Sequence, residues 1–422
     1  MRRPLPFLLL LVFLTSLLTT SFPFGQTAGR TSERRHFTRI ELSHGQKYVP
    51  GEALVRFKPG TGRQAMFSSH ARVGATVKRE FASVEGLQVV KLAPEISVKR
   101  ILRNYRQDPN VLYAEPNYIV HPTSLPNDPL FPRQWGLSNS GQDGGTSGTD
   151  IHAQQAWSVT TGSQNVVVAV IDTGIDYTHP DLAANIWSAP TSFSQTINGV
   201  SINCPAGTHG FNAVTNSCDP MDDVFHGTHV AGIIGATGNN GLGMSGVNWN
   251  VSLLACKFID AMGNGTTAGA VTCLDYVKAL KDQGVNIVAT NNSWGGNFFA
   301  RSLNDAISAL QRDGILFIAA AGNDFNDNDV VSVYPANAFL PNVISVAATN
   351  RFDLLPAFTN LGRHSVHLGA PGQEILSTLP GATYGVETGT SMSTPFVTGV
   401  AALLAAQDSA RDWRAIGARL KT

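Results

Sequence analysis

Charged residues are scarce in this sequence. Only 14% of the 422 residues are charged and the formal net charge is zero, whereas about a quarter of the residues are charged in typical soluble proteins. Because the chain as a whole has no basic excess, binding to nucleic acid through a basic surface is not expected. The zero total hides an asymmetry: residues 1–121 hold 18 Lys and Arg against 8 Asp and Glu, and residues 122–422 hold 12 against 22.

Long apolar runs are also missing. A membrane-spanning helix needs about 18 or more consecutive apolar residues, and the sequence has no such stretch. The apolar run at residues 7–18 follows Arg2 and Arg3 and is too short to span a bilayer, so it predicts a secretory signal peptide over residues 1–28. An uncleaved membrane anchor is the alternative. We expect the mature protein to be secreted, either extracellular or periplasmic, and not bound to a membrane.

Cysteine is rare as well, with only four residues. Export permits disulfides, and four cysteines allow three connectivities. Cys204 and Cys218 flank a loop rich in Gly, Asn and Pro that a disulfide could close. For Cys256 and Cys273, on a predicted strand and the next predicted helix, a disulfide and two buried free thiols are both open.

Residues 48–121 predict a small α+β domain. Strand-like and helical segments alternate there, at residues 53–57, 63–72, 87–90 and 96–107. Residues 29–47 are expected to link this domain to the signal peptide. Residues 121–133 are rich in Pro, Asn and Asp and predict a connection to a larger domain, which we place at residues 122–422.

A different pattern characterises the larger domain. Apolar runs without polar alternation recur at residues 166–171, 252–259, 286–289, 315–320 and 343–347. Strands of this kind are covered on both faces, and helix-length segments separate them. We therefore predict a doubly wound α/β fold with a mostly parallel sheet. Ligands of such sheets bind at the carboxyl ends of the strands, so the functional residues are expected there.

Four residues stand at such positions. Asp172 directly follows the first apolar run and Asn323 follows another, while His226 and Ser391 each begin a segment that resembles a buried helix. At a helix N-terminus, backbone N–H groups and the helix dipole favour a developing negative charge. The amide N–H₂ of Asn323 could donate a hydrogen bond to an oxyanion. Acid, base and hydroxyl groups are thus expected on one face of the sheet.

Each of these residues also has a simpler interpretation. Asp172 and Asn323 could shape turns, and Ser391 could cap its helix. His226 and His229 could ligate a metal with the acidic residues just upstream, but no Glu lies between them as in a His-Glu-x-x-His zinc site. An aspartic protease is excluded, because the Asp-Thr-Gly motif at Asp172 has no second Asp-Thr-Gly or Asp-Ser-Gly to pair with.

The motifs around these residues resemble the signature blocks of the subtilisin-like serine proteases. They read Asp-Thr-Gly from residue 172, His-Gly-Thr-His from residue 226, Ala-Gly-Asn ending at residue 323 and Gly-Thr-Ser-Met-Ser-Thr-Pro from residue 389. The resemblance implies a secreted endopeptidase in which Ser391 is the nucleophile, His226 is the general base and then acid, and Asp172 orients the imidazole. It also implies that Asn323 and the N–H of Ser391 form the oxyanion hole.

The same resemblance implies how protein or peptide substrates are bound. The two edges on which the family lays a peptide main chain correspond here to Ser293, Trp294 and Gly295 and to Gly263 and Gly265. Pairing of this kind reads the backbone, so broad specificity is implied. Val333 stands where relatives often have a smaller residue lining the primary pocket, which implies a narrower pocket.

A structural calcium ion is implied by the family pattern. Asp128, Asp181 and Asn240 align with the strong calcium site of the family. Their carboxylate and amide oxygens are the hard ligands that Ca²⁺ prefers. Taken alone, each of the two aspartates is better explained as a solvated surface residue.

An inhibitory propeptide is implied by residues 48–121. They resemble the family's propeptide, which acts as an intramolecular inhibitor, and an ordinary accessory domain is the alternative. We expect the mature enzyme to be a monomer.

One feature departs from the family pattern. The chain ends 31 residues after Ser391, where relatives usually continue further, and residues 412–420 resemble an unfinished helix. The C-terminus is therefore expected to be truncated. This keeps a second function open, namely a catalytically weak or inactive member that acts as a binding protein. Because all four catalytic residue types are present, an active endopeptidase is the prediction.

Overall fold

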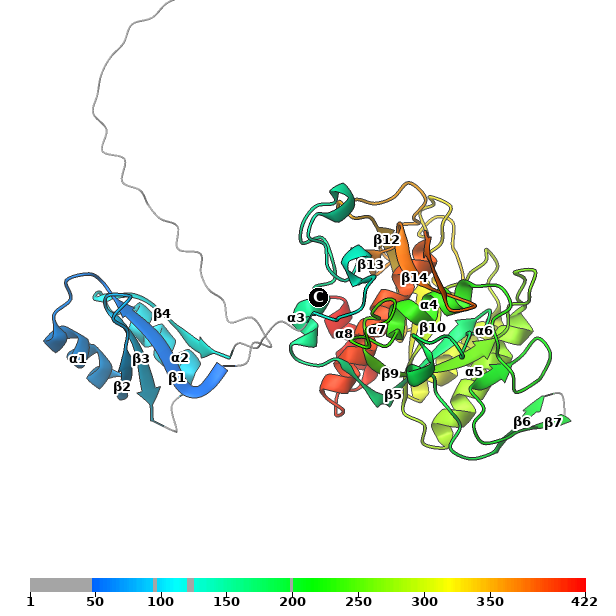
Figure 1. Ribbon diagram of the computed structural model, residues 1–422, viewed down its shortest axis with the longest axis horizontal. Helices are drawn as coiled ribbons and strands as arrows, with labels where there is room; N and C mark the ends of the chain where they lie inside the picture. The colour runs from blue at the N-terminus through cyan, green and yellow to red at the C-terminus, as the bar shows by residue number, and fades with distance from the viewer. Residues whose placement is uncertain (1–47, 94–96, 120–124, 198–199) are drawn as a thin grey trace, which may run out of the picture. The chain divides into compact units, whose positions relative to one another are not determined.

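The computed structural model describes residues 48–93, 97–119, 125–197 and 200–422 (Figure 1). The predicted signal peptide at residues 1–28 and the linker at residues 29–47 lie outside these ranges. The chain divides into two compact units, residues 1–120 and residues 121–422, here called the N-terminal unit and the C-terminal unit. Within the described ranges, no helix combines the length and apolar character that crossing a bilayer requires.

The N-terminal unit is an antiparallel sheet with two helices. Its elements are β1 (Tyr48–Phe57), α1 (Arg63–Arg72), β2 (Ala75–Glu80), β3 (Leu87–Leu92), α2 (Val98–Arg106) and β4 (Val111–Tyr118), and the strand order is β2-β3-β1-β4. The α2 residues Val98, Ile101, Leu102 and Tyr105 are buried at helical spacing and pack on the sheet. The predicted α+β fold of this unit is confirmed.

The C-terminal unit is built on a seven-stranded parallel sheet. The strand order is β13-β12-β11-β10-β5-β9-β8. These strands are β5 (Gly162–Asp172), β8 (Gly210–Asn212), β9 (Asn250–Lys257), β10 (Ile287–Asn292), β11 (Leu316–Ala320), β12 (Val343–Thr349) and β13 (Leu368–Pro371). Two antiparallel hairpins accompany the sheet, β6 (Phe193–Ile197) with β7 (Val200–Cys204) and β14 (Ile375–Leu379) with β15 (Thr383–Glu387).

Helices cover both faces of this sheet. The helices are α3 (Ala153–Trp157), α4 (His226–Gly235), α5 (Thr267–Asp282), α6 (Arg301–Arg312), α7 (Thr390–Gln407) and α8 (Trp413–Leu420). Residues of α4, α7 and α8 belong to one apolar core and residues of α5 and α6 to the other. Along β5, Val168 and Val170 face the first core, whereas Val167, Ala169 and Ile171 face the second. Because such a strand is covered on both sides, it has no polar alternation, and the predicted doubly wound fold is confirmed.

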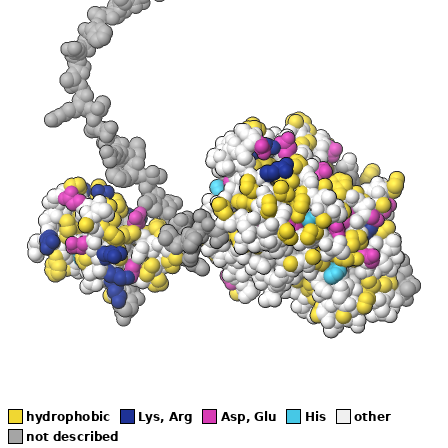
Figure 2. Space-filling view, in the orientation of Figure 1, with side chains coloured by type: hydrophobic (Ala, Val, Ile, Leu, Met, Phe, Trp, Pro, Cys, Tyr) yellow, Lys and Arg dark blue, Asp and Glu magenta, His cyan; other side chains and the backbone are white. Residues whose placement is uncertain are grey.

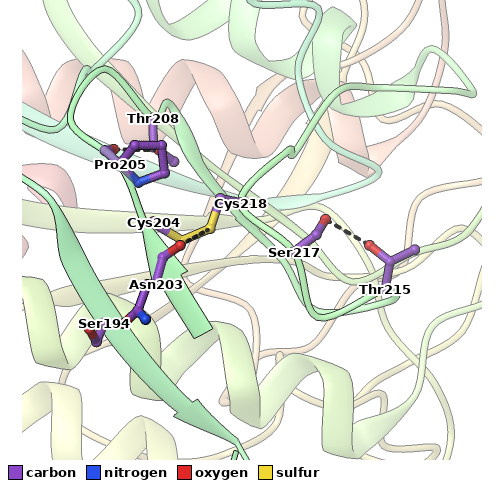
Figure 3. Close-up of a disulfide and its surroundings, with 8 residues drawn as sticks. All are labelled: Ser194, Asn203, Cys204, Pro205, Thr208, Thr215, Ser217 and Cys218. Carbon is purple, nitrogen blue, oxygen red and sulfur yellow. Dashed lines mark hydrogen bonds between the residues drawn. A yellow bond between two sulfur atoms is a disulfide. The ribbon is translucent and has the colours of Figure 1, made fainter. Parts of the chain in front are cut away.

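Both cysteine pairs form disulfides. Cys204 at the end of β7 is joined to Cys218 beyond β8, as Figure 3 shows, and this bond closes the loop that contains β8. Cys256 on β9 is joined to Cys273 on α5 inside the second core. The alternative of two buried free thiols at Cys256 and Cys273 is therefore wrong.

Candidate active site

The predicted catalytic residues lie at the carboxyl edge of the parallel sheet. Asp172 is the last residue of β5, and Asn323 follows β11. His226 is the first residue of α4 and Ser391 is the second residue of α7. Ser293 directly follows β10. Five chain segments that are far apart in the sequence thus supply side chains to one end of the sheet.

Asp172 and His226 are hydrogen-bonded to each other. The distance between Asp172 Oδ1 and His226 Nδ1 is 2.8 Å, and the Thr173 N–H donates to the same carboxylate oxygen at 2.7 Å. Because a carboxylate only accepts, Nδ1 carries the proton and Nε2 of the neutral ring is left as an acceptor. Burial of the imidazole opposes its charged form, but the charge of Asp172 and this hydrogen bond outweigh burial and raise the pKa of His226.

The residues that flank this pair bind one another. Thr173 Oγ1 donates to Asp222 Oδ1 at 2.9 Å and accepts from the Gly227 N–H at 2.8 Å. Asp222 Oδ2 accepts from the N–H of Thr228 at 3.0 Å and from its hydroxyl at 2.6 Å. Burial raises the pKa of Asp222 against the effect of these bonds. The turn after Asp172 is thereby tied to the first turn of α4.

Gly227 allows the two segments to approach this closely. A Cβ at this position would lie 2.1 Å from the backbone oxygen of Gly174, which is far inside van der Waals contact. Any side chain at residue 227 would push the start of α4 away from the end of β5. The glycine in the His-Gly-Thr-His motif is therefore required by the close packing of α4 against the turn after β5.

Ser391 is held against the end of β10. Its hydroxyl donates to the backbone oxygen of Ser293 at 3.1 Å, and the Ser293 hydroxyl donates to the backbone oxygen of Ser391 at 2.8 Å. Across the described ranges, no hydrogen bond joins Ser391 Oγ to His226. In unliganded enzymes such a bond often forms only when substrate is present.

The amide of Asn323 has one definite orientation. Its Oδ1 accepts from the Thr390 N–H at 2.8 Å and from the Thr390 hydroxyl at 2.9 Å, so the N–H₂ group points away from this helix turn. A Cβ built on Gly389 would lie 3.4 Å from Asn323 Nδ2 and 3.7 Å from the backbone nitrogen of Ser391. The space that Gly389 leaves is therefore bordered by the Asn323 amide, whose Oδ1 lies 3.6 Å away and is occupied by Thr390, and by the backbone nitrogen of Ser391 in the first turn of α7. The Asn323 N–H₂ and the Ser391 N–H are the two donors that could face a negatively charged oxygen there.

A pocket of about 220 Å³ opens beside Ser391. Its lining includes Trp294, Gly295, Gly322, Asn323, Val333 and Ser391. Val333 lies between two glycines of this lining: a Cβ added to Gly295 would lie 3.1 Å from one of its methyl groups, and a Cβ added to Gly322 would lie 3.5 Å from the other. Gly263 and Gly265 lie elsewhere, in the loop after β9 where Gly265 pairs with Ile259.

Asp128, Asp181 and Asn240 are brought together at a second place. The Asp128 carboxylate accepts the N–H groups of Asn239 and Asn240 at 2.7 and 3.1 Å, and Asp181 Oδ1 accepts from Asn240 Nδ2 at 2.8 Å. Both carboxylates are buried, and in the described part of the chain neither has an ion-pair partner. Burial raises the pKa of Asp128, and the charge of Asp181 adds to the effect.

Other groupings do not support a metal. His229 is buried within α4, and its Nε2 lies 3.1 Å from the backbone oxygen of Ile375. Burial lowers the pKa of His229 to about 4. No group of three or more His, Cys, Asp or Glu side chains able to hold a metal occurs among the residues described.

Sequence reasoning missed Thr173, Asp222 and Thr390 as organisers of this region. Thr173 and Thr390 stand inside the recognised motifs, directly beside Asp172 and Ser391. That adjacency was an available signal. Asp222 carries no comparable signal, because its partners are decided by the fold.

Two family models match the chain. Residues 163–422 match the Subtilase family, and residues 38–117 match the Fervidolysin N-terminal prodomain. The chain is 34% identical over 373 residues to the Thermophilic serine proteinase of Bacillus sp. (strain AK1), covering 88% of this chain and 82% of that protein. It is 35% identical over 283 residues to Thermitase of Thermoactinomyces vulgaris, covering 67% of this chain and 86% of that protein. Among solved structures, proteases from Pseudoalteromonas arctica are similar with a TM-score of 0.57 and 26% identity, covering 71% of this chain and 92% of that chain.

Replacement of Thr173 tests the hydrogen bonds that tie β5 to α4. Thr173→Val keeps the shape but leaves the Gly227 N–H and Asp222 Oδ1 without this partner, so the free energy of unfolding should fall by about 1–3 kcal/mol. Thr173→Ser keeps the hydroxyl and serves as the control. Denaturant unfolding of both variants, each carrying Ser391→Ala, gives the comparison. Equal unfolding free energies for the Val and Ser variants would contradict the assignment.

Proposed function

Because this chain belongs to the subtilase family and is a subtilisin-like serine protease with an N-terminal prodomain, we propose that it cleaves peptide bonds through Asp172, His226 and Ser391. The observation that carries the proposal is the Asp172–His226 hydrogen bond at the sheet edge where α7 presents Ser391. The two N–H donors around Gly389 support it.

In the proposed reaction, Ser391 Oγ turns from the Ser293 carbonyl to His226 Nε2 and attacks the carbonyl carbon of the scissile bond. His226 takes the hydroxyl proton and later gives it to the leaving amine, and Asp172 stabilises the imidazolium that forms. Asn323 Nδ2 and the Ser391 N–H receive the oxyanion. Water then cleaves the acyl-enzyme by the same steps. Since His226 must be neutral to accept the proton, activity should fall as the pH drops through its raised pKa.

Replacement of Ser391 tests this proposal. Ser391→Ala should abolish cleavage of casein and labelling by a fluorophosphonate, leaving only the residual catalysis of about 10³–10⁴ over water that binding and the oxyanion hole supply. Asn323→Ala should lower kcat by roughly 10²–10³. Ser393→Ala, a buried serine two residues away, is the matched control and should keep both activity and the label.

Retained hydrolysis in Ser391→Ala would contradict the assignment of the nucleophile. Failure of the wild-type protein to take up the label would favour the alternative, a catalytically weak or inactive binding protein. A loss below about tenfold in Asn323→Ala would leave Asn323 as a turn residue rather than an oxyanion donor.

The substrates we propose are extended protein segments. Their main chain would lie along Ser293, Trp294 and Gly295 on one side and along Gly263 and Gly265 on the other, as a strand added to these edges. The side chain before the scissile bond would enter the pocket beside Ser391. Because Val333 lies between the Gly295 and Gly322 walls, small and medium side chains fit there better than aromatic ones.

Replacement of Val333 tests this preference. Val333→Gly should raise the ratio of kcat/KM for a peptide with Phe before the scissile bond to that for one with Ala by about 10- to 100-fold, since a few methyl groups in a pocket have this effect. Val331→Gly, an exposed residue of the same loop, is the control and should leave the ratio unchanged. An unchanged ratio in Val333→Gly would show that Val333 does not limit the pocket.

The N-terminal unit is proposed as an intramolecular inhibitor of the C-terminal unit. Figure 2 shows Lys and Arg side chains scattered among Asp and Glu on the visible face of the N-terminal unit. By sequence, residues 1–121 have a basic excess and the residues after 121 an acidic one. Opposite charges speed association more than they add affinity.

We also propose that the protein is secreted and that the mature enzyme is a monomer. Both disulfides agree with an exported protein.

Calcium is proposed at Asp128, Asp181 and Asn240. The two buried carboxylates have no cationic partner among the described residues, and their oxygens are ligands that fit a hard divalent cation. Asn240 donates its N–H₂ to Asp181 in this structure and would have to turn its amide over to offer an oxygen to the ion. The ion would neutralise their repulsion and hold the N-terminal segment of the C-terminal unit against the loop after α4. Its contribution would be to stability, and no step of catalysis depends on it.

Removal of calcium tests this site. A ligand that binds only the folded state adds RT ln(1 + [L]/Kd), about 2.7 kcal/mol at a hundredfold excess over Kd, so a chelator should lower the Tm of the Ser391→Ala protein. Asp181→Asn should remove this sensitivity. Asp305→Asn, on an exposed side chain of α6, should retain it. Equal Tm values with and without chelator would rule the site out.

A further inference from the structure

A buried lysine lies beneath the proposed site. Lys257 ends β9 directly opposite Asp172 in the register of β5 and β9, and only 3% of its side chain is exposed. Its Nζ donates to the backbone oxygens of Thr173 at 2.8 Å and Ile259 at 2.9 Å, and to Asp223 Oδ1 at 2.6 Å. All three ammonium protons therefore have an acceptor.

These three acceptors belong to three different parts of the site. Thr173 begins the turn after Asp172, and Asp223 lies in the segment that leads into His226. Ile259 pairs with Gly265, so it closes the loop that carries one proposed substrate edge. One atom thus connects the segments of the proposed acid, the proposed base and a substrate-binding edge.

The chemistry of the side chain suits this connection. Lysine is rarely buried unless it is paired, because removing its charge from water is costly. An ammonium group directs three donors from a single point, whereas the planar guanidinium of arginine presents a fork that suits paired acceptors. Three acceptors from three chain segments therefore match lysine and not arginine. The two backbone acceptors follow the ends of β5 and β9, whereas the Asp223 side chain is 51% exposed.

We propose that Lys257 is a positioning residue for the protease reaction. Its ammonium group fixes the turn after Asp172, the segment before His226 and the Ile259–Gly265 edge relative to one another. The proposal rests on the proposed function, because it assumes that Asp172 and His226 act together on a substrate bound at this edge. Lys257 itself has no contact with the reacting atoms.

Replacement of Lys257 tests the proposal in the full-length protein. Lys257→Met retains most of the apolar stem and removes all three donors, so kcat should fall by about 10- to 100-fold, as expected when catalytic groups are misplaced by about 1 Å. KM should rise for an extended peptide but not for a short ester that does not reach the Gly265 edge. The acid limb of kcat/KM should also move to lower pH, because a less firmly held Asp172 raises the pKa of His226 less.

A matched control separates positioning from general stability. Lys281 is also partly buried and donates to one backbone oxygen, that of Ile287 at 2.8 Å, where β10 begins at the opposite end of the sheet. Lys281→Met should leave two quantities as in the wild type: the difference in KM between the extended peptide and the short ester, and the acid limb of kcat/KM. If the role of Lys257 were merely structural, Lys257→Met would lower the Tm but would change neither the peptide-against-ester difference in KM nor the acid limb.

Two further variants keep the test decisive. If Lys257→Met does not fold, Lys257→Arg retains the charge without the three-way donor arrangement and should fold with the same loss in kcat. Asp223→Asn should have a smaller effect, because its side chain is half exposed. A kcat/KM within about twofold of the wild type in the folded Met or Arg variant would overturn the proposal for Lys257 alone, whereas activity retained in Ser391→Ala would overturn the proposed function.

Discussion

A buried carboxylate at the end of an inner strand of the parallel sheet, β5, constrains the rest of this structure. Asp172 is fully buried between two apolar cores, where an uncompensated charge would be costly. Its Oδ1 receives hydrogen bonds from the Thr173 N–H and from His226. The segment before His226 must therefore come close to the end of β5, and Asp222 and Gly227 provide the contacts and the space for that approach. The same contacts that make the carboxylate tolerable also give the imidazole a defined orientation.

The second half of the site depends on the start of α7. This helix packs its apolar face on the first core and places its first turn beside the ends of β10 and β11. Thr390 orients the Asn323 amide, and Ser293 holds Ser391 by a reciprocal pair of hydrogen bonds. Backbone N–H groups at a helix N-terminus keep their direction without reorganisation when charge develops, which is the property that oxyanion stabilisation requires. The position of Ser391 is thus a consequence of core packing.

A different balance holds at Asp128 and Asp181. These two carboxylates are also buried, but in the described residues they face backbone N–H groups, the Asn240 amide and the Tyr384 hydroxyl rather than a charged partner. Neutral donors compensate a buried carboxylate only in part, which is why burial raises the pKa of Asp128. At the proposed active site the buried carboxylate is hydrogen-bonded to a histidine, whereas at this second place the buried negative charge has no such partner and is the basis of the proposed calcium site. The two buried acidic sites of this domain thus differ in the partners that surround their carboxylates, a histidine at one and neutral donors at the other.

The sequence alone determined the class of fold and the position of the proposed catalytic residues. Helix α1 lies at Arg63–Arg72 as predicted, and the apolar runs became β5, β9, β10, β11 and β12. These features are local. Burial on both faces of a strand requires a continuous apolar run, and a short motif directly after a strand marks the carboxyl edge of the sheet, where the proposed active site lies. Strands such as β2, with one buried residue in six, have no periodic signal and were missed. Only the tertiary structure decided the Cys256–Cys273 disulfide, the hydrogen bond from Ser391 to Ser293 and the three acceptors of Lys257. Each of these contacts joins residues that the packing of helices on the sheet brings together, and no local pattern encodes that packing.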